Sequence, residues 1–290
     1  MAWDIGVSGT VSLDDVTTPM GRRREQPGGS ALYFALAASR FARVHMSAVV
    51  GADAVGAVRA TLSGANVDLS GLEVDERPNR RWYAVHDFER WLTASESSDE
   101  GASAAWVPRI TPAVAAADVL FLGSMAPHQQ LAVLEASRPR LVGIDSMVVH
   151  IRDDPDRLWA VIEGSDVLFL NRRELSALMG CPEEQWLEPA QALCGRGRLR
   201  AVVVKGGPLG VACVTGGEVV EREAAAVSAV IDPTGAGDSL AGGFLGACAA
   251  AENDSLGFFG TALDVGLRCA ADVISDFGPA RLQARTPSAR

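Results

Sequence analysis

Residues 231–244 read Ile-Asp-Pro-Thr-Gly-Ala-Gly-Asp-Ser-Leu-Ala-Gly-Gly-Phe. The apolar residues before them predict a short strand over 226–231, and the small apolar residues 239–251 predict a buried helix. The run therefore turns from a loop into a helix, and backbone N–H groups at a helix N-terminus are free to bind an anion. Glycine also lets a phosphate approach the backbone without meeting a Cβ. We predict that three residues form this anion site: Gly235, Ala236 and Gly237.

Asp238 directly follows this predicted anion site. A carboxylate repels phosphate, but it suits an enzyme in which Asp238 takes the proton from a hydroxyl that attacks the phosphate. The alternative is an acidic residue in the first turn of a helix, where it stabilises the helix dipole. A Walker A loop is excluded because Gly237 is followed by aspartate rather than lysine. A dinucleotide-binding G-x-G-x-x-G, and with it an NAD-dependent oxidoreductase, is excluded by Leu240.

The segment 232–243 resembles the C-terminal signature of the ribokinase-like (PfkB) carbohydrate and nucleoside kinases, with Pro233 where that family has threonine. Other segments that resemble motifs of that family follow in the family's order over essentially the whole chain: Gly28–Ala31, Val50–Gly56, Asn171–Glu174 and Val202–Gly210. The resemblance implies an ATP-dependent kinase that transfers the γ-phosphoryl group to a hydroxymethyl or other alcohol group of a sugar or sugar-like acceptor.

Short apolar runs alternate with amphipathic segments along the chain. The runs predict strands over 44–50, 119–123, 141–145, 167–170 and 201–205, and the segments between them predict helices over 129–136, 157–163 and 188–195. This alternation indicates an α/β fold with a mostly parallel sheet covered on both faces. The resemblance implies a ribokinase-like three-layer sandwich, a single domain over 1–290, with a small β lid.

Two segments, 11–26 and 80–108, do not fit the alternation. Segment 11–26 is polar and rich in turn formers, whereas segment 80–108 has the pattern of a β-hairpin and includes Trp91. Within it, the polar stretch 95–103 has no apolar periodicity and is expected to be mobile. The resemblance implies that both form the lid, which covers the acceptor and often pairs two subunits, so a homodimer is expected. Two lid side chains are predicted to contact the acceptor, with an interface role as the alternative: Arg81 and Trp82.

Polar residues end several predicted strands and should meet at one edge of the sheet, where ligands of such folds bind: Asp145, Asn171, Lys205 and Asp232. The resemblance implies that Asn171 and Glu174 hold Mg²⁺ through water, but a helix capping box fits the same spacing. It further implies nucleotide contacts from Lys205, Gly207, Gly210 and Thr234. A solvated lysine at a strand end is the alternative for Lys205.

The acceptor end of the site is implied by the same resemblance. A first strand is predicted to end near 9–11, and Asp14 after it matches the family's acceptor-binding aspartate, which accepts hydrogen bonds from hydroxyls. Gly28 and Gly29 would let the sugar approach the backbone, and Asp145 would also face the acceptor. In many members the Asp232 position organises a monovalent cation site, so K⁺ is implied. Pro233 cannot donate or accept a hydrogen bond, which leaves a loop without K⁺ as the alternative.

Composition limits the partners and location. The 290 residues carry a formal net charge of −10, which argues against nucleic acid, because binding its backbone needs a basic face. The five cysteines are odd in number and form no C-x-x-C pair, so free thiols in the cytoplasm are expected. The longest uncharged apolar stretch, 239–251, is far short of the roughly 20 residues that span a bilayer, so no membrane partner is expected.

Two other functions remain open. The family uses one scaffold for sugars and nucleosides, so a nucleoside kinase is the first alternative. The other is a non-catalytic sensor that binds a nucleotide or sugar. The retention of Asp238 between the glycine turn and the helix argues against a sensor, because binding alone needs no base.

Overall fold

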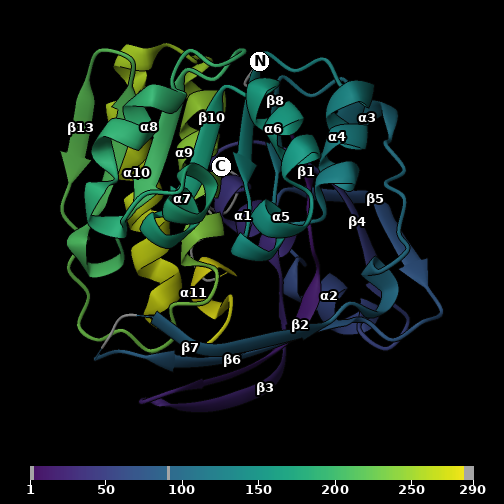
Figure 1. Ribbon diagram of the computed structural model, residues 1–290. Helices are drawn as coiled ribbons and strands as arrows, with labels where there is room; N and C mark the ends of the chain where they lie inside the picture. The colour runs from purple at the N-terminus through teal and green to yellow at the C-terminus, as the bar shows by residue number, and fades with distance from the viewer. Residues whose placement is uncertain (1–2, 90–91, 284–290) are drawn as a thin grey trace.

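The computed structural model describes residues 3–89 and 92–283. The predicted apolar runs form most of a nine-stranded sheet (Figure 1). Its strands are β1 (Ile5–Ser8), β4 (Val44–Gly51), β5 (Val67–Asp75), β8 (Val119–Leu122), β9 (Leu141–Asp145), β10 (Val167–Asn171), β11 (Ala201–Lys205), β12 (Val211–Thr215) and β13 (Val219–Arg222). Their order is β13-β12-β11-β10-β9-β8-β1-β4-β5. Neighbours from β5 to β11 are parallel, and β12 and β13 add antiparallel.

Helices cover both faces of this sheet, as predicted. One face carries α1 (Ser30–Ala38), α2 (Val55–Thr61), α9 (Ala236–Ala251), α10 (Phe259–Ile274) and α11 (Ala280–Gln283). The other carries α3 (Pro112–Ala115), α4 (Pro127–Ala136), α5 (Val148–Asp153), α6 (Pro155–Glu163), α7 (Arg172–Met179) and α8 (Leu187–Leu193). Short 3-10 helices are η1 (Gly101–Ser103), η2 (Glu183–Gln185), η3 (Gly207–Leu209) and η4 (Leu256–Phe258).

Strand side chains alternate between the two hydrophobic cores. On β8, Phe121 packs into the core of α1 and α9, whereas Leu120 and Leu122 pack into the core of α4 and α6. Phe121 stacks on Phe34 of α1 with ring centroids 4.1 Å apart. Because both faces are buried along β8, β9, β10 and β11, these strands read as apolar runs, which is why the sequence pattern located them.

The two segments that did not fit the alternation form a smaller sheet (Figure 1, bottom of the view). Its strands are β2 (Ser12–Thr18), β3 (Gly21–Gly28), β6 (Arg80–Asp87) and β7 (Leu92–Asp99), in the order β3-β2-β6-β7. The predicted hairpin is β6 and β7, which are antiparallel. Trp91 lies outside the described residues. We call this four-stranded sheet the lid.

Two local expectations were wrong. Residues 226–231 form no strand: the Ile231 N–H bonds to the carbonyl of Ile274 in α10 rather than to a strand. Residues 95–103, expected to be mobile, continue β7 and then form η1, because lid pairing overrides their lack of apolar periodicity. The first strand ends at Ser8, just before the predicted end near 9–11, and Asp14 lies in the lid strand β2, within the lid segment 11–26. Among the described residues, no helix has the length and apolar character that a membrane span requires.

Candidate functional site

The carboxyl ends of the central strands bring distant polar residues together. The registers place Asp145 beside Phe169 and Asn171 beside Lys205. A cavity of about 290 Å³ lies between this edge and the lid. Of the residues predicted from the sequence, these line it: Asp14, Gly29, Trp82, Asp145, Asn171, Glu174, Lys205, Thr234, Gly235, Gly237 and Asp238. We call it the acceptor cavity.

Another cavity of about 450 Å³ adjoins it, with apolar walls from α9, α10 and the segment between β13 and α9. It is lined by the predicted nucleotide residues Gly207 and Gly210, and by Ala236 at the start of α9. We call it the nucleotide cavity. The two cavities share five lining residues: His86, Thr93, Lys205, Pro233 and Gly237. They therefore meet at the N-terminus of α9.

The turn into α9 has the predicted form. Gly235 is the N-cap with φ +76°, in the left-handed region that favours glycine. A side chain at this position would overlap the ring of Tyr33, a buried residue of α1. Asp232 is also buried, and its Oδ1 accepts the Thr234 N–H at 2.9 Å. The Tyr33 contact and the Asp232 hydrogen bond both restrain the loop, so the backbone N–H groups at the N-terminus of α9 are held in place before a ligand binds.

Asp238 lies in the first turn of α9 on the wall of the acceptor cavity. Burial raises its pKa to about 7, and the nearby carboxylates of Asp145, Glu174 and Asp14 act in the same direction. Lys205 opposes them. A carboxylate with a pKa near neutrality is suited to accept a proton from a hydroxyl.

Lys205 is not a solvated strand-end lysine. Its Nζ lies 2.6 Å from Oδ2 of Asp145, and both side chains are largely buried. Burial acts to lower the pKa of Lys205, but Asp145 and Glu174 outweigh it and raise that pKa above its ordinary value. A Cβ at Gly237 would lie 3.0 Å from Nζ, so the charged amine stands beside the opening of α9. It carries its positive charge to the point where the cavities meet.

Asn171 and Glu174 form the capping box that their spacing allowed. Asn171 Oδ1 accepts the Glu174 N–H at 2.8 Å, and Glu174 Oε2 accepts the Asn171 N–H at 2.7 Å. Burial raises the pKa of Glu174 to about 7, while Lys205 acts to lower it. Within residues 3–89 and 92–283, no group of three or more His, Cys, Asp or Glu side chains is placed to hold a metal ion. The capping role is therefore present in the structure, and the role in Mg²⁺ binding stays a prediction.

Asp14 faces the acceptor cavity from β2 and accepts a hydrogen bond from Ser12 Oγ at 2.6 Å. Burial raises its pKa to about 7 although Ser12 lowers it. The two glycines are required by the protein itself. A side chain at Gly28 would overlap the Asp14 carboxylate, and Gly29, with φ +95°, leaves no room for one beside the Thr10 carbonyl. Gly29 lines the cavity, whereas Gly28 lies behind Asp14.

The lid presents Arg80 and Trp82 to the acceptor cavity, but not Arg81. Side chains alternate along a strand, so Arg81 points to the other face. There it pairs with Glu25 at 2.9 Å and Asp53 at 3.6 Å. The sequence indicated a lid contact near this position, but only the strand register decides which of two adjacent residues makes it.

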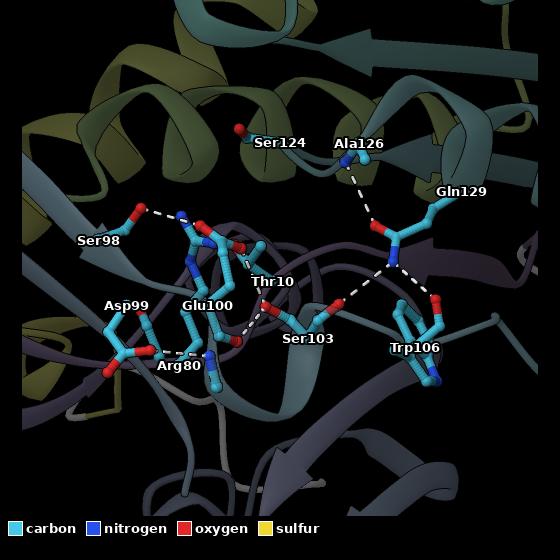
Figure 2. Close-up of polar contacts among 12 residues, drawn as sticks. Thr10, Arg80, Ser98, Asp99, Glu100, Ser103, Trp106, Ser124, Ala126 and Gln129 are labelled. Atoms are coloured by element: carbon cyan, nitrogen blue, oxygen red, sulfur yellow. Dashed lines mark hydrogen bonds and ion pairs between the residues drawn. The ribbon is translucent and has the colours of Figure 1, made fainter. Parts of the chain in front are cut away.

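Arg80 is held by a polar network that joins the lid to the body (Figure 2). Its guanidinium pairs with Glu100, which also accepts from Ser98 and Ser103. Gln129 of α4 donates to the carbonyls of Ser103 and Trp106, as Figure 2 shows. This network fixes one end of the lid.

Three residues that matter to the site were not predicted from the sequence: Tyr33, Arg80 and His86. Tyr33 follows the double-glycine segment, where an aromatic residue in a buried helix reads as core. Burial and the nearby carboxylates of Asp14, Asp232 and Asp238 raise the pKa of Tyr33 well above its ordinary value, so the phenol stays protonated. For the other two, inward alternation from Trp82 along β6 was the available signal.

The chain is similar to several known kinases. The chain is 28% identical to a cytidine kinase from Thermococcus kodakarensis over 248 residues, which cover 83% of this chain and 87% of the relative. Its fold is similar to that of a nucleoside kinase from Methanocaldococcus jannaschii, with TM-score 0.72, 21% identity and coverage of 97% of this chain and 98% of that one. It is also similar to an adenosine kinase from Sinorhizobium meliloti, with TM-score 0.78, 17% identity and 98% coverage of both chains.

The family comparison covers almost the whole chain. Residues 7–285 match the family described as "pfkB family carbohydrate kinase", and this range includes both lid segments, the glycine turn and Asp238. Members of this family transfer a phosphoryl group to an alcohol acceptor. The match, together with a mostly parallel sheet and a lid over the site, shows that this chain belongs to the pfkB family of carbohydrate kinases.

Proposed function

We propose that this protein transfers the γ-phosphoryl group of ATP to a primary hydroxyl of a sugar or of the sugar ring of a nucleoside. The observation that carries the proposal is the meeting of two cavities at Gly237 and Lys205, with Asp238 on the acceptor side. A donor in the nucleotide cavity and an alcohol in the acceptor cavity would be joined only at this point. Direct transfer needs this arrangement, because the attacking and leaving oxygens lie in line across the phosphorus.

ATP suits the nucleotide cavity. Small apolar residues of α10, Ala270 and Ala271, line it and leave space for a flat base. The cavity runs from there to the opening of α9, where backbone N–H groups and Lys205 favour phosphate. A ribokinase from Cryptococcus neoformans with a similar fold, TM-score 0.77, was solved in complex with ADP. Both facts support an adenine nucleotide as the donor.

In the proposed mechanism Asp238 accepts the proton of the acceptor hydroxyl as its oxygen attacks the γ-phosphorus. The bond between that phosphorus and the bridging oxygen of ATP breaks, and ADP leaves with the electron pair. The amides of Gly235, Ala236 and Gly237, with Lys205, stabilise the negative charge on the phosphoryl group in transit. Asp14 accepts hydrogen bonds from other hydroxyls of the acceptor and so orients it.

The donor set of the site fits Mg²⁺. Carboxylates outnumber cations here, since Asp145, Glu174 and Asp238 surround Lys205. Burial raises the pKa of Glu174 and of Asp238, and the neighbouring carboxylates act in the same direction. We propose that Glu174 and Asn171 hold Mg²⁺ through its water ligands, as a cation that keeps most of its water requires. When bound, Mg²⁺ neutralises phosphate charge.

A monovalent cation near Asp232 is proposed on narrower grounds. The side chain is buried, and one of its oxygens accepts the Thr234 N–H. K⁺ would balance the remaining charge of this carboxylate. Dependence of the rate on K⁺ against Na⁺ at constant ionic strength tests this: an equal rate in both salts removes K⁺ from the proposal.

Of the two acceptor classes, the nucleoside has the more specific support. The indole of Trp82 lines the acceptor cavity from the lid, where it can stack on a base. The curated relative at 28% identity is a cytidine kinase. A free sugar is the other candidate, favoured by the hydroxyl groups of Thr10, Ser12 and Ser30 along the same wall.

The test is a screen of the purified protein with Mg-ATP and ribose, fructose, cytidine, adenosine and inosine. ADP release and the mass of the phosphorylated product are measured for each acceptor. Transfer to a nucleoside but not to ribose supports the nucleoside assignment, and the reverse supports the sugar. Binding of an acceptor without any transfer would instead identify a non-catalytic sensor.

We also propose a cytoplasmic homodimer. The outer lid face exposes Tyr83 and Val85, with 40% and 43% of their surface accessible, and Met20 is exposed at the turn between β2 and β3. The five cysteines are free, as a reducing compartment would keep them. Light scattering of the protein, compared with a Val85→Lys variant, tests the dimer: a wild-type mass equal to one chain would contradict it.

A further inference from the structure

The lid strand β6 spans the acceptor cavity and is tied to the body at both ends. At its start, Arg80 pairs with Glu100, which accepts from Ser103 (Figure 2). Gln129 of α4 in turn donates to the Ser103 carbonyl and so connects this end to the body. At its end, the imidazole of His86 contacts the loop that precedes α9, with Nε2 3.2 Å from Oγ1 of Thr234. Trp82 lies between these two residues on the cavity wall. The position of β6 above the acceptor is therefore set partly by the loop that opens α9.

The neighbouring lid strand β2 makes a second contact with the loop that precedes α9. Thr18 Oγ1, at the end of β2, donates to the carbonyl of Ile231 at 2.9 Å. Thr17 is paired with Val85 in the register of β2 and β6, so Thr18 and His86 lie side by side near the ends of these two strands. Two neighbouring strand ends thus hold successive parts of one loop.

The Thr234 hydroxyl belongs to the residue that leads into the glycine turn. Its own N–H is bonded to Asp232, and Gly235 follows as the N-cap of α9. On the other side, His86 Nδ1 lies 3.3 Å from Oγ1 of Thr93, across the lid hairpin. The two hydrogen bonds that link Thr93, His86 and Thr234 therefore connect both strands of the hairpin to the anion-binding turn Gly235–Gly237.

The imidazole is suited to this bridging position. It is 8% exposed, and burial lowers its pKa although Asp232 acts in the opposite direction. A neutral imidazole has one donor and one acceptor nitrogen, and each threonine hydroxyl can do either, so both contacts are satisfied in either tautomer. Among the lid residues that the structure describes, only His86 and its partner Thr93 line both cavities.

We propose that His86 is a positioning residue that links closure of the lid over the acceptor to placement of the amides at Gly235–Gly237. This inference deepens the proposed kinase function and rests on it. With the link in place, closure of the lid adds a restraint on the anion-binding turn beside the Tyr33 contact and the Asp232 hydrogen bond. The link favours transfer to the acceptor over transfer to water, which has no need of the lid.

The test compares two substitutions at this position. His86→Phe keeps a ring of similar size and loses both hydrogen bonds, and His86→Gln keeps a donor and an acceptor. Loss of a neutral hydrogen bond is worth about three- to tenfold, so kcat of the Phe variant should fall about tenfold. The ratio of acceptor-free ATP hydrolysis to acceptor phosphorylation should rise by a similar factor. The Gln variant should recover most of both values.

A double-mutant cycle with Thr234→Val identifies the partner. If the two residues act through one bond, the double variant should lose no more activity than the more impaired of the single variants. Losses that multiply would overturn the link. Tyr83→Phe, which removes an exposed hydroxyl from the outer face of the same strand, is the matched control and should leave kcat unchanged. If His86→Phe does not fold, Thr93→Val and Thr234→Val each remove one of the two hydrogen bonds of His86 and test the same link.

Amide hydrogen exchange separates this inference from the proposed function. In the His86→Phe protein, exchange should rise at both the β6 amides and the Gly235–Asp238 amides, whether or not the protein is a kinase. Unchanged exchange at the glycine turn contradicts the link alone. Absence of phosphoryl transfer by the wild-type protein to every acceptor contradicts the proposed function, and leaves the exchange result to decide the link.

Discussion

The ring of Tyr33 occupies the space in which a side chain at Gly235 would stand. The two residues lie at the N-terminal parts of α1 and α9, so this contact locks the anion-binding turn onto the core. Gly235→Ala has to displace the ring and place alanine at φ +76°, which costs about 1–3 kcal/mol for the backbone alone.

We therefore expect Gly235→Ala to lower Tm by several degrees and kcat by at least ~10²-fold, measured by calorimetry and by ADP release. Gly237→Ala is the comparison, because the nearest atom to its Cβ is the flexible end of Lys205, at 3.0 Å. It should fold with a smaller loss of stability. Equal Tm values for the Gly235 variant and the wild type would contradict the account of this contact.

Asp238→Asn tests the general base. The amide cannot accept the hydroxyl proton, so kcat should fall by about 10²–10⁴-fold with little change in acceptor affinity. Single-turnover rates and calorimetric titration measure the two quantities. A variant that retains more than half of the wild-type turnover removes Asp238 from this role.

The pH dependence of kcat/KM should follow the same carboxylate. With its pKa raised to about 7 by burial and by nearby carboxylates, Asp238 is ionised only above that pH, so the rate should rise to a plateau near pH 8. Glu174→Gln removes one of the charges that raise this pKa, so the acidic limb should move to lower pH. The same variant should need more Mg²⁺ for half-maximal rate. A lower Tm with an unchanged Mg²⁺ profile would instead limit Glu174 to its capping box.

Asp14→Asn should weaken acceptor binding but raise the stability of the folded protein above pH 7. Loss of hydrogen bonds to a charged group is worth about 1.5–3 kcal/mol, so Asp14→Asn should weaken acceptor binding about ten- to a hundredfold and spare ATP. In the folded protein the pKa of Asp14 is raised from 3.8 to about 7, so its stabilising contribution is complete below pH 3.8 and is lost as pH rises through 7.

Asp14→Asn should therefore have a higher Tm than the wild type at pH 8, by about 2 °C or more, and this gain should disappear towards pH 4. Thermal unfolding at the two pH values measures it. Impaired ATP binding with intact acceptor binding would mean that Asp14 faces the wrong end of the site.

Lys205 and Asp145 should act as a pair in stability but not in activity. Lys205→Met leaves Asp145 buried without its cation, and breaking such a pair costs about 3–5 kcal/mol. Asp145→Asn in the same chain should restore most of the lost stability, since no uncompensated charge remains. Denaturant unfolding of the single and double variants measures this, and kcat should stay low in both because the cation at the phosphoryl position is gone.

The strand ends of the main sheet were accessible to prediction because each buried strand is an unbroken apolar run that stops at a polar residue. Asp145, Asn171 and Lys205 follow such runs, and parallel strands bring their carboxyl ends to one edge. Asp238 was found in another way, from a glycine turn that precedes a helix of small residues. Family resemblance then supplied the order of the segments, which local patterns could not.

The lid was harder to predict, for a physical reason. Along β6 both faces mix polar and apolar side chains, with Arg80 and Trp82 toward the cavity and Arg81 and Tyr83 on the other face. The sequence therefore lacks the apolar alternation of a packed sheet. Whether Arg80 or Arg81 faces the acceptor depends on the pairing of β2 with β6, since one residue of slip exchanges the two faces. His86 is tied to Thr234, 148 positions away, and no local pattern encodes that contact.

The shared wall of the two cavities has a consequence for inhibition. A donor-like half and an acceptor-like half joined through a short chain of phosphates could occupy both cavities at once, passing Gly237 and Lys205 at the junction. Once one half is bound, the other is held at an effective concentration in the millimolar range, so affinity should exceed that of either half by orders of magnitude. The acceptor half of such a bisubstrate ligand would contact Trp82 and Arg80 of the lid, so its chemistry can be chosen to fit these two side chains.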